Sequence, residues 1–269
     1  MIKDSIIFLG STKFSEQVLN YLIEDRCTIT AIFSIPKSFK ISYSKDKVVN
    51  TNFSDLSKYA KELSIPFFEV NSENGKRLSD FKSEIKRLSP KVIIAAGWYY
   101  MVPKLIRSIP ENGVWGLHAS LLPNYAGGAP LVWAIINGEK ETGVSLFKMD
   151  QGVDDGDLIL QDKFTIDFND NIKTLLEKAL ISSKKILLSA LNQKTVKYFP
   201  QDKSKIKVYP QRSPNDGEID WSLDATKIRD FVRAQTKPYP GAWTKINNKK
   251  ITIWDISIEE TEKLKDKKS

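Results

Sequence analysis

Short apolar runs alternate with amphipathic stretches along the first hundred residues. The strand candidates are 5–9, 28–35, 66–70 and 92–96, and the helix candidates between them are 14–22, 56–63 and 78–88. Such alternation predicts an α/β fold in which a parallel sheet carries helices on both faces. Functional sites in these folds lie beyond the carboxyl ends of the strands. Gly10 and Gly97 each follow one of these predicted strands.

The second half of the chain predicts one long helix and then a smaller unit. Apolar residues recur at helical spacing from 170 to 191, with Asn169 or Asp170 available as the N-cap. Residues 199–217 are rich in proline and poor in buried residue types, which is typical of a linker. A short helix about 228–232 and two β-like runs follow, and we expect this small unit to pack against the first domain.

The chain of 269 residues holds only one histidine, His118, and one cysteine, Cys27. This count excludes disulfides, cysteine-rich zinc sites and any metal centre that needs two histidines, although a magnesium site made of carboxylates alone survives it. If the chemistry near neutral pH needs a histidine, His118 is the one available.

The net charge of +8 suits an anionic partner such as a nucleotide, a folate polyglutamate or RNA. Because lysine supplies most of the positive charge, we favour solvated lysine faces over a dedicated nucleic-acid stripe. The longest apolar run, 92–102, is too short to cross a bilayer, so we expect a soluble cytoplasmic protein with no membrane partner. The sequence is also compatible with a homodimer.

The densest group of chemically capable residues lies between 113 and 157. His118 follows a predicted strand and precedes Ser120 and a glycine-rich loop, where free backbone N–H groups suit the stabilisation of developing negative charge. The later acidic loop holds Asp154, a carboxylate that is able to orient an imidazole. The residues alone leave a second interpretation open, in which His118 is a core histidine and the acidic loop is a surface turn or a cation site.

The run 118–130, together with Gly138, Thr142–Gly143 and 154–156, resembles the signature of the family that transfers a formyl group from N10-formyltetrahydrofolate. Residues 212–221 and 238–241 resemble the second domain of its tRNA and aminoarabinose members. The resemblance implies a Rossmann-like, parallel-sheet formyltransferase domain over 1–198. It implies a linker and a small, mostly β C-terminal domain over 199–269.

The same resemblance implies direct transfer to an amine, without a covalent enzyme intermediate and without a metal. His118 and Asp154 match two members of the family's Asn-x-His and Asp pattern, and Ser120 would be a supporting hydrogen-bonding residue. Gly116 stands where the pattern has asparagine. Loss of one oxyanion donor costs about 10²–10³ in rate, so another donor, a slow enzyme or a lost activity all stay open. We favour a working enzyme with a rearranged oxyanion site.

The resemblance also implies where the ligands bind. The folate would lie between the segment after the fourth strand and the acidic loop, lined by Gly97, Trp98, Tyr99, Tyr100, Asp150, Gln151, Gly152 and Val153. The aromatic side chains offer a flat wall for a pterin ring, although ordinary core packing explains them equally well. We predict that the acceptor contacts Gly10, Ser11, Thr12, Gly127, Gly128 and Pro130. Free N–H groups at 10–12 would take its phosphate, although a plain strand-to-helix turn explains this segment equally well.

The acceptor itself is predicted to be a small-molecule amine, a nucleotide-linked amino sugar. Methionyl-tRNA is the alternative, favoured by the basic charge and by a lysine-bearing stretch after Ile35. The short second domain argues against it. A third hypothesis, a folate-binding relative without catalysis, follows from Gly116 alone.

Overall fold

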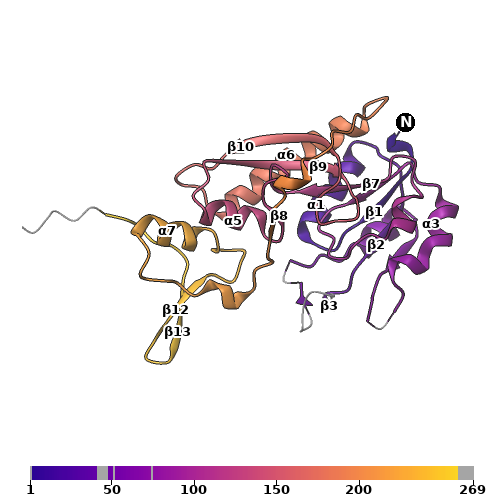
Figure 1. Ribbon diagram of the computed structural model, residues 1–269. Coiled ribbons are helices and arrows are strands. Elements are labelled where there is room, and N and C mark those ends of the chain that lie inside the picture. The colour runs from indigo at the N-terminus through magenta and orange to yellow at the C-terminus, as the bar shows by residue number, and fades with distance from the viewer. Residues whose placement is uncertain (1, 41–47, 51, 74, 260–269) are drawn as a thin grey trace, which may run out of the picture.

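The computed structural model describes residues 2–40, 48–50, 52–73 and 75–259, and it contains a seven-stranded central sheet (Figure 1). In spatial order the strands are β10 (Leu158–Thr165), β9 (Glu141–Lys148), β7 (Val114–His118), β6 (Val92–Ala95), β1 (Ile6–Leu9), β2 (Ile29–Ser34) and β5 (Phe67–Glu69). Neighbours from β7 to β5 are parallel, whereas β9 is antiparallel to both β7 and β10. The predicted α/β class is therefore confirmed.

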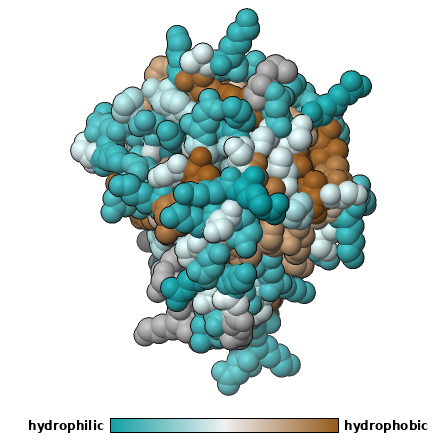
Figure 2. All heavy atoms as spheres, turned by 90° about the vertical axis from the view of Figure 1, so that its right-hand side faces the viewer, coloured by the Kyte–Doolittle hydropathy of each residue, from teal (hydrophilic) through white to brown (hydrophobic). Residues whose placement is uncertain are grey.

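Helices cover both faces of this sheet. They are α1 (Lys13–Glu24), α2 (Ser57–Glu62), α3 (Lys82–Leu88), α4 (Lys104–Arg107), α5 (Pro130–Ile136) and α6 (Ile172–Leu191), whereas α7 (Ala225–Arg233) belongs to the C-terminal unit. Shorter elements are η1 (Ile2–Asp4), β3 (Ser38–Phe39), β4 (Val48–Val49), η2 (Leu78–Phe81), β8 (Ala126–Gly127), η3 (Lys203–Lys205), β11 (Val208–Tyr209) and η4 (Pro214–Gly217). Seen from the side of α3, hydrophilic side chains cover most of the surface, with separate apolar areas between them (Figure 2).

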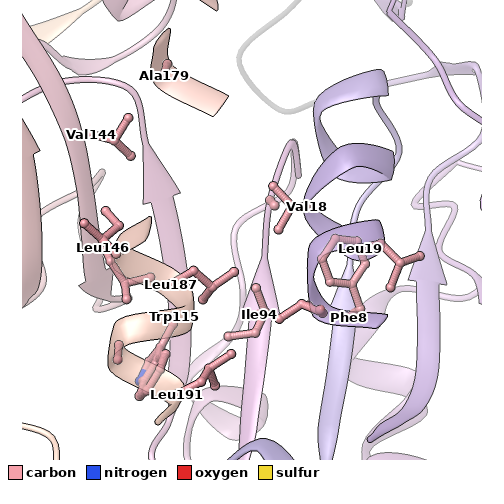
Figure 3. Close-up of a cluster of buried hydrophobic side chains, with 14 of the residues drawn as sticks. Phe8, Val18, Leu19, Ile94, Trp115, Val144, Leu146, Ala179, Leu187 and Leu191 are labelled. Carbon is pink, nitrogen blue, oxygen red and sulfur yellow. The ribbon is translucent and has the colours of Figure 1, made fainter. Parts of the chain in front are cut away.

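The two faces of β1 explain why its sequence is a continuous apolar run. Ile6 and Phe8 point into the cluster under α1 and α6, where Trp115 of β7 also lies (Figure 3). Ile7 and Leu9 point into the second cluster, under α3 and α4. Because successive strand residues face opposite sides, a strand covered on both faces needs apolar residues throughout.

The N-terminal cap of α6 corrects one prediction. The cap is Asn171, whose side chain accepts hydrogen bonds from the backbone N–H groups of Lys173 and Thr174, so the expected caps at Asn169 or Asp170 are wrong. Asp170 accepts instead from the hydroxyl of Thr174 and pairs with Lys178. The polar run before the helix offered neighbouring capping residues, and hydrophobic spacing alone does not distinguish them.

The C-terminal unit consists of α7 and the hairpin of β12 (Ala242–Ile246) and β13 (Lys249–Ile253), which lie to one side of the sheet (Figure 1). A small cluster that includes Ile228 and Val232 forms its core. It docks on the larger domain as expected, because Arg233 donates to the carbonyl of Asp170 and α7 contacts α5. No helix among the described residues is long and apolar enough to span a membrane.

The stretch predicted to be a linker is attached along its length to the larger domain. Its strand β11 pairs in parallel with β8. Phe199 exchanges two backbone hydrogen bonds with Leu158 at the start of β10, with N···O distances of 2.8 and 2.9 Å. The linker therefore passes alongside the start of β10 and the loop that follows His118.

Candidate active site

His118 ends strand β7, and both of its ring nitrogens face acceptor oxygens. Nε2 lies 2.7 Å from the carbonyl oxygen of Tyr125, and Nδ1 lies 3.4 Å from Oδ2 of Asp154. Because a carbonyl oxygen only accepts, Nε2–H is the donor in the first contact. The ring is 9% exposed, so few other groups compete for it. The structure thus brings the two predicted catalytic residues together.

Asp154 is held in a backbone conformation that non-glycine residues seldom adopt. Its φ of +51° lies in the left-handed region, which aspartate tolerates better than most side chains. The N–H of Gly127 donates to Oδ2 at 2.8 Å, and the side chain of Gln201 donates to the backbone carbonyl, also at 2.8 Å. The oxygen that faces His118 therefore has a fixed direction.

A buried hydrogen-bond network shapes the loop that follows His118. The hydroxyl of Ser120 donates to the carbonyl of Asn124 at 2.6 Å. Ser145 of β9 donates to the carbonyl of Ser120 at 2.6 Å and accepts from the N–H of Leu122 at 3.0 Å. Since Ser120 is fully buried and turned onto its own loop, it stabilises the loop that carries the Tyr125 carbonyl.

Gly116 lies opposite Phe147 in the sheet, and the ring of that phenylalanine fills the space above it. A Cβ atom at Gly116 would lie 2.8 Å from Cε1 of Phe147 and 2.9 Å from Cε of Met149. These distances are shorter than any ordinary carbon contact. A side chain at position 116 is therefore incompatible with the present packing.

The predicted folate residues lie at the carboxyl ends of β6 and β9. Trp98 and Tyr100 meet edge to face at 6.0 Å, and both pack with Met149 against the same core cluster. The indole N–H of Trp98 and the hydroxyl of Tyr100 are buried and have no hydrogen-bond partner among the described residues. Buried polar groups are rarely left unpaired, so these two are available to a bound ligand.

The remaining predicted folate residues are placed as follows. Gly97 has a φ of +61° and lies against Thr12, Tyr99 donates to Asn50 at 3.4 Å, and Asp150 lies 3.5 Å from Lys203. Gln151 and Val153 are exposed, and the N–H of Gly152 donates to Asp155 at 3.0 Å. The aromatic segment follows β6 and the acidic loop follows β9, and their joint role in folate binding stays a prediction.

The turn 10–12 does not offer the free N–H groups that we predicted. Ser15 Oγ accepts from the N–H groups of Ser11 and Thr12 at 3.1 and 3.0 Å, and Gly10 donates to the carbonyl of Phe33 at 3.1 Å. The prediction of free N–H groups is therefore wrong, because the serine at the third helical position accepts from two of these donors. Contact of the acceptor with residues 10–12 stays a prediction.

The glycines of the loop before α5 make room for the linker. Gly127 donates to Asp154 and Gly128 donates to the carbonyl of Tyr209 at 2.8 Å, so neither N–H group is free for an acceptor as predicted. A Cβ at Gly127 would lie 2.5 Å from the carbonyl oxygen of Tyr209, and one at Gly128 would collide with the backbone of Gln211. Pro130 is the first residue of α5, a position that suits its fixed φ.

Two further residues shape the site without any sequence signal that we recognised. Burial and a hydrogen bond to Glu139 raise the pKa of Tyr125, whose ring stacks on Tyr209 with centroids 4.8 Å apart. The Tyr125 hydroxyl therefore stays protonated at neutral pH. Gln201 lies in the predicted linker, where low apolar content gave no reason to expect a buried side chain.

Cys27 stands outside this chemistry. Its thiol is buried, and burial raises the pKa to about 11, so it is not a thiolate at neutral pH.

Comparison with known proteins identifies relatives over nearly the whole chain. The methionyl-tRNA formyltransferase of Caldanaerobacter subterraneus subsp. tengcongensis is 33% identical over 258 residues, which are 95% of this chain and 81% of that protein. A solved methionyl-tRNA formyltransferase from Clostridium thermocellum has a TM-score of 0.62 at 21% identity, with 95% of this chain and 94% of that chain covered.

A second solved structure has the same fold. It is an N-formyltransferase from Helicobacter canadensis, determined with folinic acid and dTDP-3-aminofucose, with a TM-score of 0.68 at 20% identity, covering 92% of this chain and 86% of that one. The family description "Formyl transferase" matches residues 4–191, and "Formyl transferase, C-terminal domain" matches residues 211–268. The protein therefore belongs to the formyl transferase family, whose members are enzymes that transfer formyl groups.

Proposed function

We propose that this formyltransferase acts on the amine of methionyl-tRNA, with His118 and Asp154 serving the transfer. The observation that carries this choice is the 33% identity to a methionyl-tRNA formyltransferase across 95% of the chain. It reverses our sequence-based preference for a nucleotide-linked amino sugar. The two solved structures, one of each kind, are both about 20% identical and so favour neither acceptor.

The formyl donor of the family is N10-formyltetrahydrofolate, and the residues present fit it. The N–H of Trp98 and the hydroxyl of Tyr100, which no other described residue pairs with, offer buried hydrogen bonds beside an aromatic wall. We propose that these two side chains, with the loop 150–153, hold the folate. When bound, the donor supplies the electrophilic formyl carbon.

The chain's own residues then handle charge and protons. Nδ1 of His118 faces Asp154, so the reacting groups would contact Nε2. For this, Nε2 must give up its hydrogen bond to the Tyr125 carbonyl. With the ring proton on Nε2, His118 donates to the developing oxyanion. With the ring proton on Nδ1, which faces Asp154, Nε2 takes the proton that the attacking amine must lose. Asp154 stabilises the ring when it carries the additional proton.

The C-terminal hairpin supports a nucleic-acid acceptor. Lys250 and Lys245 lie over the ring of Trp243, at 4.6 and 5.3 Å from its centroid, and Lys237 lies 5.2 Å from that of Trp254. Trp221 and Trp254 are 52% and 41% exposed on the same unit. Trp243 itself is buried, so the exposed rings of this unit are Trp221 and Trp254, of which Trp254 lies beside Lys237. Exposed aromatic rings near lysines are typical of surfaces that contact single-stranded nucleic acid. Of the lysine-bearing stretch after Ile35, residues 41–47 lie outside the described residues.

One assay tests the acceptor. The protein is incubated with N10-formyltetrahydrofolate and, separately, with methionyl-tRNA and with UDP- or dTDP-4-amino sugars, and release of tetrahydrofolate is followed. We expect turnover with methionyl-tRNA only. Turnover with an amino sugar alone would restore our first hypothesis, and no turnover with any acceptor would favour the non-catalytic relative.

Reversing two hairpin charges should weaken tRNA binding. We expect Lys245→Glu/Lys250→Glu to raise the Kd for tRNA and to flatten its salt dependence, because each lost phosphate contact lowers the slope of log K against log salt by about 0.7–0.9. The matched control is Lys82→Glu/Lys86→Glu, an equal charge change on exposed residues of α3. Equal weakening by both pairs would show that net charge alone attracts the RNA.

The cytoplasmic location, the homodimer and the domain boundary at 198/199 stay predictions.

A further inference from the structure

The linker between the two domains is tied to the loop that carries Asp154 as well as to the strands around it. Lys203 pairs with Asp155 at 3.1 Å, and β11 lies against the loop whose Gly127 donates to Asp154. Both loops that contact His118 are therefore held by residues that follow the predicted catalytic domain. Among these residues, Gln201 makes the most direct contact.

Gln201 is 8% exposed, and its amide nitrogen donates twice. The acceptors are the backbone carbonyls of Asp154, at 2.8 Å, and Gly156, at 2.6 Å. An amide nitrogen carries two hydrogens, so both are used. These bonds join the two ends of the short turn that presents the Asp154 carboxylate.

The carbonyl oxygen of the Gln201 side chain indicates that the donor end of this residue is the end that matters. Oε1 of Gln201 is buried without a hydrogen-bond partner among the described residues. Leaving a buried acceptor unpaired is unfavourable, so the two hydrogen bonds at the donor end must offset this cost. A carboxylate of the same shape would offer no donor at all to the two carbonyls.

We propose that Gln201 is a positioning residue for the reaction: by holding the carbonyls of Asp154 and Gly156, it keeps the Asp154 carboxylate directed at His118. The left-handed backbone of Asp154 is intrinsically unfavourable, so it persists only where its surroundings hold it. Without these two hydrogen bonds the backbone relaxes, and Oδ2 leaves the 3.4 Å contact with Nδ1. The inference about catalysis rests on the proposed function, whereas the inference about geometry does not.

The kinetic test compares Gln201→Glu and Gln201→Ala with the wild-type protein. We expect kcat to fall by about 10²-fold with little change in the KM of the acceptor, since a displacement of about 1 Å in a catalytic group costs a factor of this size. In an Asp154→Asn background, the loss of Gln201 should lower kcat less than threefold further, because both changes remove the same contact. If the fall in kcat of the double variant equals the product of the two single falls, the proposal is overturned.

The matched control is Gln235→Ala. Gln235 is 7% exposed, accepts from Arg212 and donates to the carbonyl of Phe231, so it is an equally buried, hydrogen-bonded glutamine outside the site. Urea unfolding of both variants shows whether they lose comparable stability. A fall in kcat for Gln235→Ala as large as that for Gln201→Ala would assign the effect to general destabilisation and overturn the proposal. If Gln201→Glu does not fold, Gln201→Ala carries the same comparison.

A second readout needs no activity. Because His118 is the only histidine, its ring gives a single, unambiguous set of NMR signals. We expect both Gln201 variants to shift these signals in the direction that Asp154→Asn shifts them, and Gln235→Ala to leave them in place. Unmoved His118 signals in a folded Gln201 variant would overturn the proposal. A shifted signal in a protein that transfers no formyl group would sink the proposed function and leave the positioning role intact.

Discussion

Replacing His118 with asparagine is expected to lower kcat for formyl transfer by about 10³-fold, in the middle of the range for a positioned general acid or base. Asparagine keeps a donor that can reach the Tyr125 carbonyl, so the loop should hold its shape. It has no group that changes its protonation between pH 5 and 8. Asp154 would therefore have no positively charged ring to stabilise. The measurement is single-turnover release of tetrahydrofolate with saturating acceptor.

Ser120→Ala is the comparison that separates chemistry from loop structure. It removes one hydrogen bond from the same loop and leaves the imidazole in place, so we expect a fall in kcat below tenfold. If His118→Asn reacts at a near-normal rate, the assignment of the proton or oxyanion role to His118 is wrong. If Ser120→Ala loses as much as His118→Asn, the loop rather than the ring limits the reaction.

The parallel sheet and the position of His118 could be predicted because both depend on neighbouring residues. The inner strands β1, β2 and β6 are mostly apolar runs that are followed by a glycine or bounded by a polar residue, and the order of runs and amphipathic stretches determines the class of fold. The single histidine falls at the end of such a run. Its contact with Asp154 followed from the resemblance, and the structure shows how β7 and the acidic loop meet.

The predictions that went wrong concern hydrogen bonds that depend on distant or unrecognised partners. The N–H groups of 11 and 12 seemed free at the start of a helix, yet the hydroxyl of Ser15 takes both. Gly127 and Gly128 are predicted to contact the acceptor, whereas in the structure they allow the backbone of residues 208–211 to pack closely against their loop. Nothing in a proline-rich segment indicates which strand it will cross, so neither β11 nor Gln201 had a local signal.

Restoring the family's asparagine by Gly116→Asn is expected to damage the protein rather than improve it. The new Cβ would lie within 3 Å of Phe147 and Met149, and the ring of Phe147 is 2% exposed against Leu122 and Ala126. Overpacking of this kind lowers the free energy of unfolding by about 1–3 kcal/mol. We expect kcat to fall as well, since the displaced ring borders the strand that ends at His118. Urea unfolding and the tetrahydrofolate assay measure the two effects.

Phe147→Leu in the same chain should reverse both losses. Leucine lacks the Cε1 and Cζ atoms that stand closest to the new side chain, while it keeps an apolar contact with Leu122. The decisive comparison is Gly116→Asn/Phe147→Leu against Phe147→Leu alone. A kcat about 10-fold or more higher in the double variant, within the 10²–10³ that one oxyanion donor contributes, means that the missing amide limits the natural enzyme. An equal kcat in a stable double variant means that another donor already stabilises the oxyanion. The space beside Gly116 that Phe147 fills would then have no role in the reaction.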